Sequence, residues 1–435
     1  MKVWIRLIAV TVLVVPLLLV VAPAYAEGPM ADEITIASVG DPYATALDKA
    51  IPEFTALTGI KVNQEVFDYD NGRKKQLLDA TGGSTLYDIY SIDVPWVGEF
   101  DDPGYMVPLD DLIAAEAANI VLDDYPQPVW DAHKWNGVQY QIPLATGVEM
   151  LFYRKDLFEK DGIKVPETTQ EFLDACKHFT KALNPDSPTE YGCAQNGQKG
   201  AAIAQQWMSW NSAFGGVPII EQDGKLVANM SSPEGIKAAE FMKEMLPTMP
   251  PNALELAWDS VFEEIAQGRV AMAPQWASRV FLIENPEKSA VSGKIGYALF
   301  PHDEGLPSRP GLGGYGMGIN AGVSDERKAA AWEFMKWLAN PAGEKMLVKY
   351  GDNAAANRYS SLANCEYQAF YPNWPVMLES YQRANHNFRT RYPAYNTMSD
   401  ALGVEISEMM LGSKTAQEAL DAAQAVVAEE LARME

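Results

Sequence analysis

The sequence predicts an α/β fold built as two lobes, and three observations support this prediction. With 435 residues, the chain is longer than one compact core of ordinary size, so two lobes of roughly 150 to 200 residues are expected. Segments with the two-residue alternation of strands are followed by segments with helical spacing. Hydrophobic residues at 48% and charged residues at 21% are typical of a globular protein with a sizeable core.

The first 26 residues have the composition of a cleaved export signal. A basic start precedes an uncharged apolar run at 7–21, and Ala24 and Ala26 place small residues where a signal peptidase reads. The run is shorter than the about 20 residues of a membrane-spanning helix, and no cysteine follows it to carry a lipid. We therefore expect cleavage after Ala26 and a periplasmic protein with no membrane insertion, with secretion as the alternative.

The chain is strongly acidic, because its formal net charge is -24. Nucleic acid and anionic membrane surfaces are therefore poor partners for it. Solubility is the simplest role of this charge.

Three cysteines, Cys176, Cys193 and Cys365, would lie in an oxidising compartment. A helix expected over 169–182 leads directly to a strand near Tyr191, so Cys176 and Cys193 are the candidates for a disulfide. The third thiol would then be left over.

The N-terminal part of the chain reads as strands joined by helices. Alternation at 33–39 and 60–67 flanks helical spacing at 44–58, and a helix at 71–80 followed by a strand at 87–92 repeats the pattern. Such crossover connections predict a parallel sheet.

Ligands bind open sheets of this kind at the carboxyl ends of the strands. Asp41 and Tyr43 follow the first expected strand, and Asp93 and Trp96 follow the third. These residues are the first candidates for a binding site.

The stretch PLATGVEMLFYRKDLF, at 143–158, alternates as a strand, but Thr146 and Gly147 interrupt it. Two explanations fit such a break: a loose surface strand, or a segment that crosses between two lobes.

Helix signals recur toward the C-terminus. Asn340 and Pro341 form an N-cap and first-turn pair, and an apolar stripe on 329–339 marks the preceding helix as part of the core. Thr415 with Glu418 resembles a capping box that starts the last helix.

Gly311, Gly313 and Gly316 spell GxGxxG, the fingerprint of a dinucleotide-binding loop. That loop needs a strand before it and a helix after it, whereas here a proline-containing segment precedes the glycines and a strand expected at 316–321 follows them. We therefore expect no nucleotide cofactor. Gly313 and Gly314 would instead let the backbone come close to a ligand.

Signatures of catalysis and metal binding are missing from the sequence. The four histidines have no metal-ligand spacing, and neither a Walker A loop nor a GxSxG elbow occurs. A glycosidase would need a carboxylate pair, and no pair stands out among the 58 acidic residues. No metal, no cofactor and no enzymatic activity are therefore expected.

Aromatic residues stand beside polar ones at several expected strand ends. Trp96 follows Asp93, Trp276 lies in APQWASR, and Tyr315 adjoins Gly314. Flat rings stack on the C–H faces of sugars, while Asp, Asn and Arg side chains bond hydroxyl groups. This recurrence predicts a carbohydrate-binding cleft.

Five stretches resemble the extracellular solute-binding proteins of ABC sugar importers, the family that includes maltose-binding protein, and they follow the family's order over essentially the whole mature length. They are FTALTGIKV, YDIYSIDVPWVGEF, WNGVQYQIPLATGVEMLFYRKDLFEKDGIKVPET, FEEIAQGRVAMAPQW and GGYGMGINAGVSDERKAAAWEFMKWLANPAGEKML.

The resemblance implies a two-lobed type II periplasmic binding protein fold whose chain crosses the hinge about three times. Thr146 and Gly147 would then lie at the hinge and absorb the dihedral changes of closure. Crossings are expected at 143–147, 301–305 and 353–356, with an N-terminal lobe at 27–142 plus 306–352 and a C-terminal lobe at 148–300 plus 357–435.

The resemblance also assigns site residues. Asp41 matches the sugar-contacting aspartate after the first strand, and Trp276 matches the family's stacking tryptophan. Gly147 replaces a cleft glutamate, and nothing at 395–400 matches the late stacking tryptophan, so a monosaccharide, polyol or disaccharide is implied in place of a maltodextrin. The expected ligand-binding residues are Asp41, Tyr43, Asp70, Asp93, Trp96, Thr146, Gly147, Trp207, Trp276, Gly314, Tyr315 and Arg358, with Glu149 beside them.

In such proteins the ligand binds one lobe, closure buries it between both, and the permease recognises the closed form. The resemblance thus implies a monomeric periplasmic component of an ABC importer that binds a small sugar or sugar alcohol and meets permease subunits at the inner membrane. Two alternatives stay open: a binder of another solute, such as a polyamine or a metal ion, and a periplasmic glycan-acting enzyme.

Overall fold

The computed structural model describes residues 29–350 and 356–434. The expected export signal, its cleavage after Ala26 and most of the expected crossing at 353–356 lie outside the described residues. Within the two described ranges, no helix is long and apolar enough to cross a membrane.

The predicted strand–helix–strand units are confirmed. They comprise β1 (Glu33–Val39), α1 (Pro42–Thr58), β2 (Lys61–Phe67), α2 (Tyr69–Gly82) and β3 (Ile89–Asp93). β1 lies between β2 and β3 and pairs in parallel with both. Helix α1 begins at a proline, which suits the first turn, and ends at Gly59 in a left-handed conformation. The carboxyl ends of β1 and β3 therefore lie side by side, as a ligand site requires.

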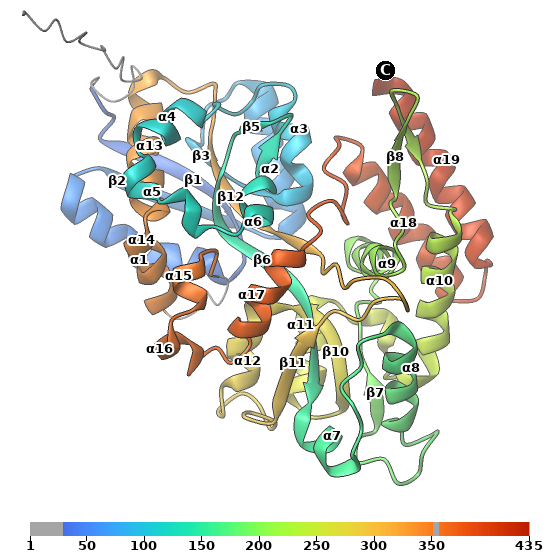
Figure 1. Cartoon of the computed structure of the whole chain (residues 1–435). Helices are drawn as coiled ribbons and strands as arrows, with labels where there is room; N and C mark the ends of the chain where they lie inside the picture. The colour runs from blue at the N-terminus through green and yellow to red at the C-terminus, as the bar shows by residue number, and fades with distance from the viewer. Residues whose placement is uncertain (1–28, 351–355, 435) are drawn as a thin grey trace, which may run out of the picture.

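One sheet extends through both halves of the molecule. Its order is β2-β1-β3-β12-β6-β10-β7, and β11 also pairs with β6. The long strand β6 (Ile142–Arg154) pairs with β12 (Leu312–Ile319) along its first half, and with β10 (Val270–Trp276) and β11 (Ile295–Leu299) along its second. β6 thus joins the body that holds β1, β2 and β3 to the body that holds β7, β10 and β11 (Figure 1).

The expected break at Thr146 and Gly147 is wrong. β6 is continuous over 13 residues, and these two residues pair with Gly314 and Gly313 of β12. Both strands carry an irregularity: Gly314 of β12 has φ 99°, and Tyr315 and Gly316 pair with Ala145 and Pro143, which leaves Leu144 of β6 as an extra residue. Glycine adopts this φ without the steric cost of a Cβ, and the extra residue in β6 forms a β-bulge two residues before Thr146.

Of the two explanations for the 143–158 stretch, the loose surface strand is also wrong. Residues 142–152 are all buried, and the strand runs from one body into the other (Figure 1). The number of hinge crossings and the expected lobe boundaries stay predictions.

Helices cover the sheet of each body. The first carries α13 (Asp325–Ala339) and α14 (Pro341–Lys349), and the predicted cap is confirmed because Asn340 Oδ1 accepts hydrogen bonds from the N–H groups of Ala342 and Gly343. The second contains α9 (Ala201–Ala213), which is buried on nearly all sides and packs against α10 (Pro233–Met245) and α18 (Tyr395–Met410). The last helix, α19 (Ala416–Met434), starts at the predicted Thr415–Glu418 pair, whose side chains and backbone are hydrogen-bonded.

Shorter elements connect these layers. They are α3 (Val97–Asp101), α4 (Asp110–Ala115), α5 (Ala117–Ile120), α6 (Gln127–Asp131), β4 (Lys134–Trp135), β5 (Val138–Gln139), α7 (Lys155–Asp161), α8 (Thr169–His178), β7 (Tyr191–Cys193), β8 (Ile219–Gln222), β9 (Lys225–Ala228), α11 (Trp258–Ala266), α12 (Val280–Glu284), α15 (Tyr359–Leu362), α16 (Cys365–Gln368) and α17 (Trp374–Arg383). Helix α8 ends four residues before the predicted 182, and β12 begins four residues before the predicted 316.

The GxGxxG glycines lie in and beside a strand. Gly313 and Gly316 belong to β12, and Gly311 directly precedes it. No helix opens on this segment, in agreement with the rejection of a nucleotide loop.

The suggested disulfide is wrong, because Cys176 and Cys193 are free thiols, both buried. The two side chains are neighbours, and burial together with Cys193 raises the pKa of the Cys176 thiol. Cys193 Sγ instead lies 3.3 Å from the hydroxyl of Thr248. Cys365 is exposed and free.

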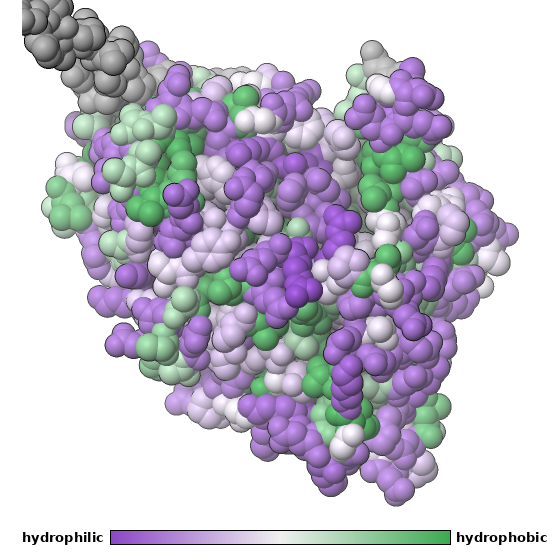
Figure 2. Space-filling model, in the orientation of Figure 1, coloured by the Kyte–Doolittle hydropathy of each residue, from purple (hydrophilic) through white to green (hydrophobic). Residues whose placement is uncertain are grey.

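The surface is largely hydrophilic on the face shown in Figure 2. Figure 2 shows hydrophilic side chains over most of one face, with hydrophobic ones in small separate groups.

Candidate functional site

A cavity of about 250 Å³ lies between the two bodies. Its floor is the β6–β12 pair, which contributes Ala145, Gly147, Gly314 and Tyr315. One wall comes from the carboxyl ends of β1 and β3 and the start of α2, and the other from α9, α11 and the end of β10. The walls are formed by Val39, Gly40, Asp41, Asp68, Tyr69 and Asp93 on one side and by Gln205, Trp258, Asp259, Trp276, Ser278, Arg279 and Arg389 on the other.

The structure brings half of the expected site residues to this cavity. Their places in the sequence are far apart, and the parallel strands with the β6–β12 floor gather them. They are Asp41, Asp93, Gly147, Trp276, Gly314 and Tyr315.

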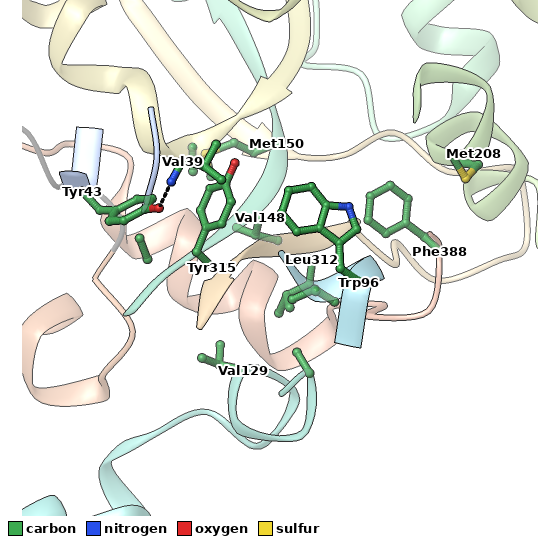
Figure 3. Close-up of a cluster of buried hydrophobic side chains, with 14 of the residues drawn as sticks. Val39, Tyr43, Trp96, Val129, Val148, Met150, Met208, Leu312, Tyr315 and Phe388 are labelled. Carbon is green, nitrogen blue, oxygen red and sulfur yellow. Dashed lines mark hydrogen bonds between the residues drawn. The ribbon is translucent and has the colours of Figure 1, made fainter. Parts of the chain in front are cut away.

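Two expected aromatic residues stand behind the cavity wall. Tyr43 is fully buried, and its hydroxyl accepts a hydrogen bond from the Val39 N–H and lies 2.6 Å from Ser91 Oγ. Figure 3 shows its ring beside that of Tyr315, with ring centroids 5.0 Å apart. Trp96 is also fully buried and packs against the Tyr69 ring. Both rings support lining residues and do not line the cavity themselves.

Every polar group of Thr146 has a hydrogen-bond partner within the protein. Its N–H donates to Asn357 Oδ1, its carbonyl accepts from the Tyr381 hydroxyl, and its Oγ1 lies 3.3 Å from His133 Nε2. Its expected role in ligand contact is replaced by a position at the centre of a buried network, between β6 and the segments that hold Asn357 and Tyr381.

Two other expected contacts belong to the core. Trp207 is fully buried in α9, where its indole N–H donates to the carbonyl of Gly235. Arg358 is fully buried beside α14, with its guanidinium 3.9 Å from the Tyr125 ring centroid and a hydrogen bond to the carbonyl of Ala339. A buried guanidinium needs such partners, and here the protein supplies them to both terminal nitrogens, while the Nε–H of Arg358 has no hydrogen-bond partner among the described residues.

The expected Asp70 lies in the first turn of α2 and does not line the cavity, whereas its two predecessors do. Asp68 caps α2 by accepting from the N–H of Asn71, and this hydrogen bond is the main cause of the lowered pKa of its carboxyl. Tyr69 directs its hydroxyl to Asp93 Oδ2 at 2.7 Å. The correct loop was predicted, but not which of its side chains face inward.

The sequence also missed six lining residues in the second body: Gln205, Trp258, Asp259, Ser278, Arg279 and Arg389. Ser278 and Arg279 lie in the APQWASR stretch quoted above, so the sequence did contain a signal for these two residues. The others sit on helices or loops without a motif, and only folding brings them to the strand ends.

Acidic and basic side chains pair across the cavity. Asp93 and Arg389 form a buried bidentate ion pair, with oxygen–nitrogen distances of 2.9 and 3.1 Å. Arg279 pairs with Asp259 and lies 3.6 Å from Asp41. Burial raises the pKa of Asp41 to about 6, and Arg279 opposes this shift.

A hydrogen-bonded chain supports the wall that holds Trp258. The Trp258 indole N–H donates to Gln205 Oε1, and the Gln205 amide donates to Glu149 Oε1 at 2.9 Å. Ser209 Oγ donates to the same oxygen. Burial raises the pKa of Glu149 to about 7. Glu149 does not line the cavity, whereas Gln205 does.

Trp276 lies over paired glycine backbones. Gly147 and Gly313 are cross-strand partners, and a Cβ placed on them would lie 3.5 Å and 2.9 Å from the Trp276 ring. The ring is half-buried, with Arg389 5.4 Å from its centroid. The cavity therefore combines aromatic rings with polar side chains that can donate hydrogen bonds to hydroxyl groups or accept them. This arrangement suits a polyhydroxylated molecule. Within the described ranges, no three His, Cys, Asp or Glu side chains are grouped to hold a metal ion.

Comparison with known proteins agrees with this geometry. An ABC transporter solute-binding protein from Agrobacterium radiobacter, solved in complex with ribitol, has a TM-score of 0.85 and 33% identity and covers 93% of this chain and 100% of that chain. A solute-binding protein from Agrobacterium vitis with bound D-mannitol has a TM-score of 0.80 and 25% identity, covering 93% and 99%. A probable amino-acid ABC transporter periplasmic-binding protein of Sinorhizobium fredii is 25% identical over 335 residues, 76% of this chain and 73% of that protein.

These likenesses confirm the type II periplasmic binding protein fold and the resemblance drawn from the sequence. The relatives are binding proteins of ABC transporters, and their periplasmic or extracellular place implies the same side of the membrane for this chain. Residues 37–345 match the sequence pattern of the bacterial extracellular solute-binding proteins, so the chain belongs to that family.

Proposed function

We propose that this protein is the periplasmic substrate-binding component of an ABC importer and that it captures one neutral sugar alcohol or monosaccharide. The cavity between the two bodies, where Trp258 and Trp276 stand beside Asp–Arg pairs, is the observation that carries this proposal. Closure of the lobes buries the ligand and presents the closed form to the permease subunits.

The size of the cavity favours a small ligand. A volume of about 250 Å³ equals that of about eight water molecules, at about 30 Å³ each. A five- or six-carbon polyol or a monosaccharide fits this space. Among small carbohydrates, the shorter ones therefore suit this site best.

Similar proteins support the polyol class. The Agrobacterium radiobacter protein was solved with ribitol and the Agrobacterium vitis protein with D-mannitol. A mannitol-binding protein of Pseudomonas aeruginosa is 23% identical to this chain over 94% of its length. Arg279 and Arg389 are both paired with aspartates, so neither is free for the carboxylate of an amino acid.

A ligand panel tests the proposal. Ribitol, D-mannitol, D-tagatose, D-glucose, maltose, an amino-acid mixture and spermidine are each added to the purified protein, and thermal unfolding and calorimetry are recorded. A ligand at 100 times its dissociation constant adds about 2.7 kcal/mol to the unfolding free energy. We expect this stabilisation from a neutral polyol or monosaccharide.

Stabilisation by amino acids or spermidine alone would assign the site to the other solute class. Hydrolysis of maltose during the measurement, followed by mass spectrometry, would instead show a glycan-acting enzyme.

We also propose that the mature protein begins at Glu27, after cleavage behind Ala26. Mass spectrometry of the exported protein tests this expectation, and an intact apolar run 7–21 on that protein contradicts it.

A further inference from the structure

The carboxylate of Asp93 is fully used by the protein. Its Oδ2 accepts from the Tyr69 hydroxyl at 2.7 Å and from Arg389 Nη1 at 2.9 Å. Its Oδ1 accepts from the Gly314 N–H at 3.2 Å and from Arg389 Nη2 at 3.1 Å. A carboxylate offers about four lone-pair sites, so Asp93 has none left for a ligand hydroxyl, although it lies at the cavity.

Arg389 is fixed beside Asp93 by glycine backbones. A Cβ on Gly313 would collide with Arg389 Nη2, and a Cβ on Gly311 would lie 2.7 Å from the ring of Phe388, the preceding residue. The first two glycines of the GxGxxG stretch thus form a notch that receives Phe388 and Arg389. The notch and the bidentate pair leave the guanidinium little freedom.

The same guanidinium still has hydrogen-bonding capacity at the cavity. Arg389 is 5% exposed and lines the cavity, and because Nη1 and Nη2 each give one N–H to Asp93, each keeps a second N–H. A buried donor without an acceptor is unfavourable. A ligand oxygen placed there satisfies this donor.

The charge balance of the cavity decides which kind of oxygen fits. Its lining carries four carboxylates and two guanidinium groups. Asp93 neutralises Arg389, and Asp259 and Asp41 neutralise Arg279. A carboxylate ligand would meet an excess of negative charge with no free cation, whereas a neutral hydroxyl accepts from Arg389 without that cost.

We propose that Arg389 is a specificity-determining residue that donates hydrogen bonds to a ligand hydroxyl, and that Asp93 is a positioning residue that restricts this donor to neutral ligands. The proposal rests on the proposed function and deepens it: the site selects neutral polyols or sugars against sugar acids of the same length. Asp93 acts through Arg389 and does not touch the ligand.

The test measures affinities for D-mannitol and D-gluconate, a neutral polyol and a sugar acid of equal carbon number, at one pH and salt concentration. The wild type should bind D-mannitol at least a hundredfold more tightly. Asp93→Asn releases Arg389 to pair with the gluconate carboxylate, so the mannitol-to-gluconate affinity ratio should fall at least tenfold. Arg389→Gln removes the donor and leaves Asp93 uncompensated, so mannitol affinity should fall at least tenfold while the ratio does not fall.

Asp88→Asn is the matched control. Asp88 is likewise buried and paired with an arginine, Arg327, at 2.6 Å, but it lies away from the cavity. Its substitution should leave the affinity ratio unchanged. Melting curves of all variants without ligand show whether each is folded, and if Asp93→Asn does not fold, Arg389→Gln decides.

Equal losses of mannitol and gluconate affinity in folded Asp93→Asn would overturn the inference, and so would unchanged mannitol affinity in Arg389→Gln. A wild type that binds both ligands equally also overturns it. These results leave the proposed function standing, whereas a wild type that binds no neutral polyol or sugar of the wider panel overturns both.

Discussion

Trp276 is the residue on which ligand affinity is expected to depend most directly. Its half-buried ring lines the cavity over the Gly147 and Gly313 backbones. Stacking on a ligand face combines apolar burial with C–H contact, so Trp276→Ala should weaken polyol binding by about 1.5 to 3 kcal/mol. Calorimetry with D-mannitol or ribitol measures this loss.

Trp207→Ala provides the contrast, because this ring is fully buried in α9. It should lower the unfolding free energy by about 3 to 5 kcal/mol, whereas Trp276→Ala should leave the unligated protein folded. Unchanged affinity in folded Trp276→Ala removes that ring from the binding site, and collapse of the unligated variant assigns it to the core.

Glu149 should make stability depend on pH. Burial raises the pKa of this carboxyl from its ordinary value of 4.5 to about 7. Because the folded pKa is the higher one, the contribution of Glu149 to the unfolding free energy is complete below about pH 4.5 and is lost as the pH rises through 7. Glu149→Gln should remove this loss, so the variant should gain up to about 3 kcal/mol over the wild type between pH 5 and pH 8.

Urea unfolding at both pH values measures this gain. Glu159→Gln, on an exposed position of α7, is the control and should show no pH-dependent gain. Equal effects of the two substitutions would mean that Glu149 titrates as a solvated carboxyl.

At the scale of elements, the β6–β12 pair requires glycine on one strand more than on the other. A Cβ on Gly313 would collide with Arg389 and approach the Trp276 ring to 2.9 Å, whereas a Cβ on Gly147 meets only that ring, at 3.5 Å. Gly313→Ala should therefore destabilise the protein by about 1 to 3 kcal/mol and weaken ligand binding at least tenfold. Gly147→Ala should change stability by less than about 1 kcal/mol, since 3.5 Å is an ordinary contact.

Gly82→Ala is the control for these glycine substitutions, because a Cβ there meets nothing within 4 Å. It should be neutral or slightly stabilising. Melting curves and calorimetry on the three variants check the order, and equal tolerance of Gly313→Ala and Gly147→Ala would contradict the notch described here.

At the scale of the whole molecule, the cavity lies between two bodies joined by β6 (Figure 1). If the lobes close on the ligand, the protein becomes more compact, because closure is a rigid-body motion about the connecting strands. Solution scattering should therefore show a smaller radius of gyration with saturating polyol than without it. A tightly binding polyol that leaves the radius unchanged would rule out the hinge account.

The predicted elements owe their success to local physics. The alternation at 33–39, the Asn340–Pro341 cap and the Thr415–Glu418 box depend on neighbours within a few residues, so they could be read without a structure. Asp41 and Asp93 were found for a similar reason, because the ends of parallel strands meet at one edge of the sheet.

By itself, the sequence determined the α/β fold, its βαβ start and the family resemblance, since periodicity, caps and motif order are local or linear properties of the chain. Only the tertiary structure decided which side chains face the cavity. Burial placed Arg358 and Trp207 in the core and brought Arg389 to Asp93, 296 residues away. Facing and long-range pairing depend on how helices pack on the sheet, and a single residue of rotation or register changes them.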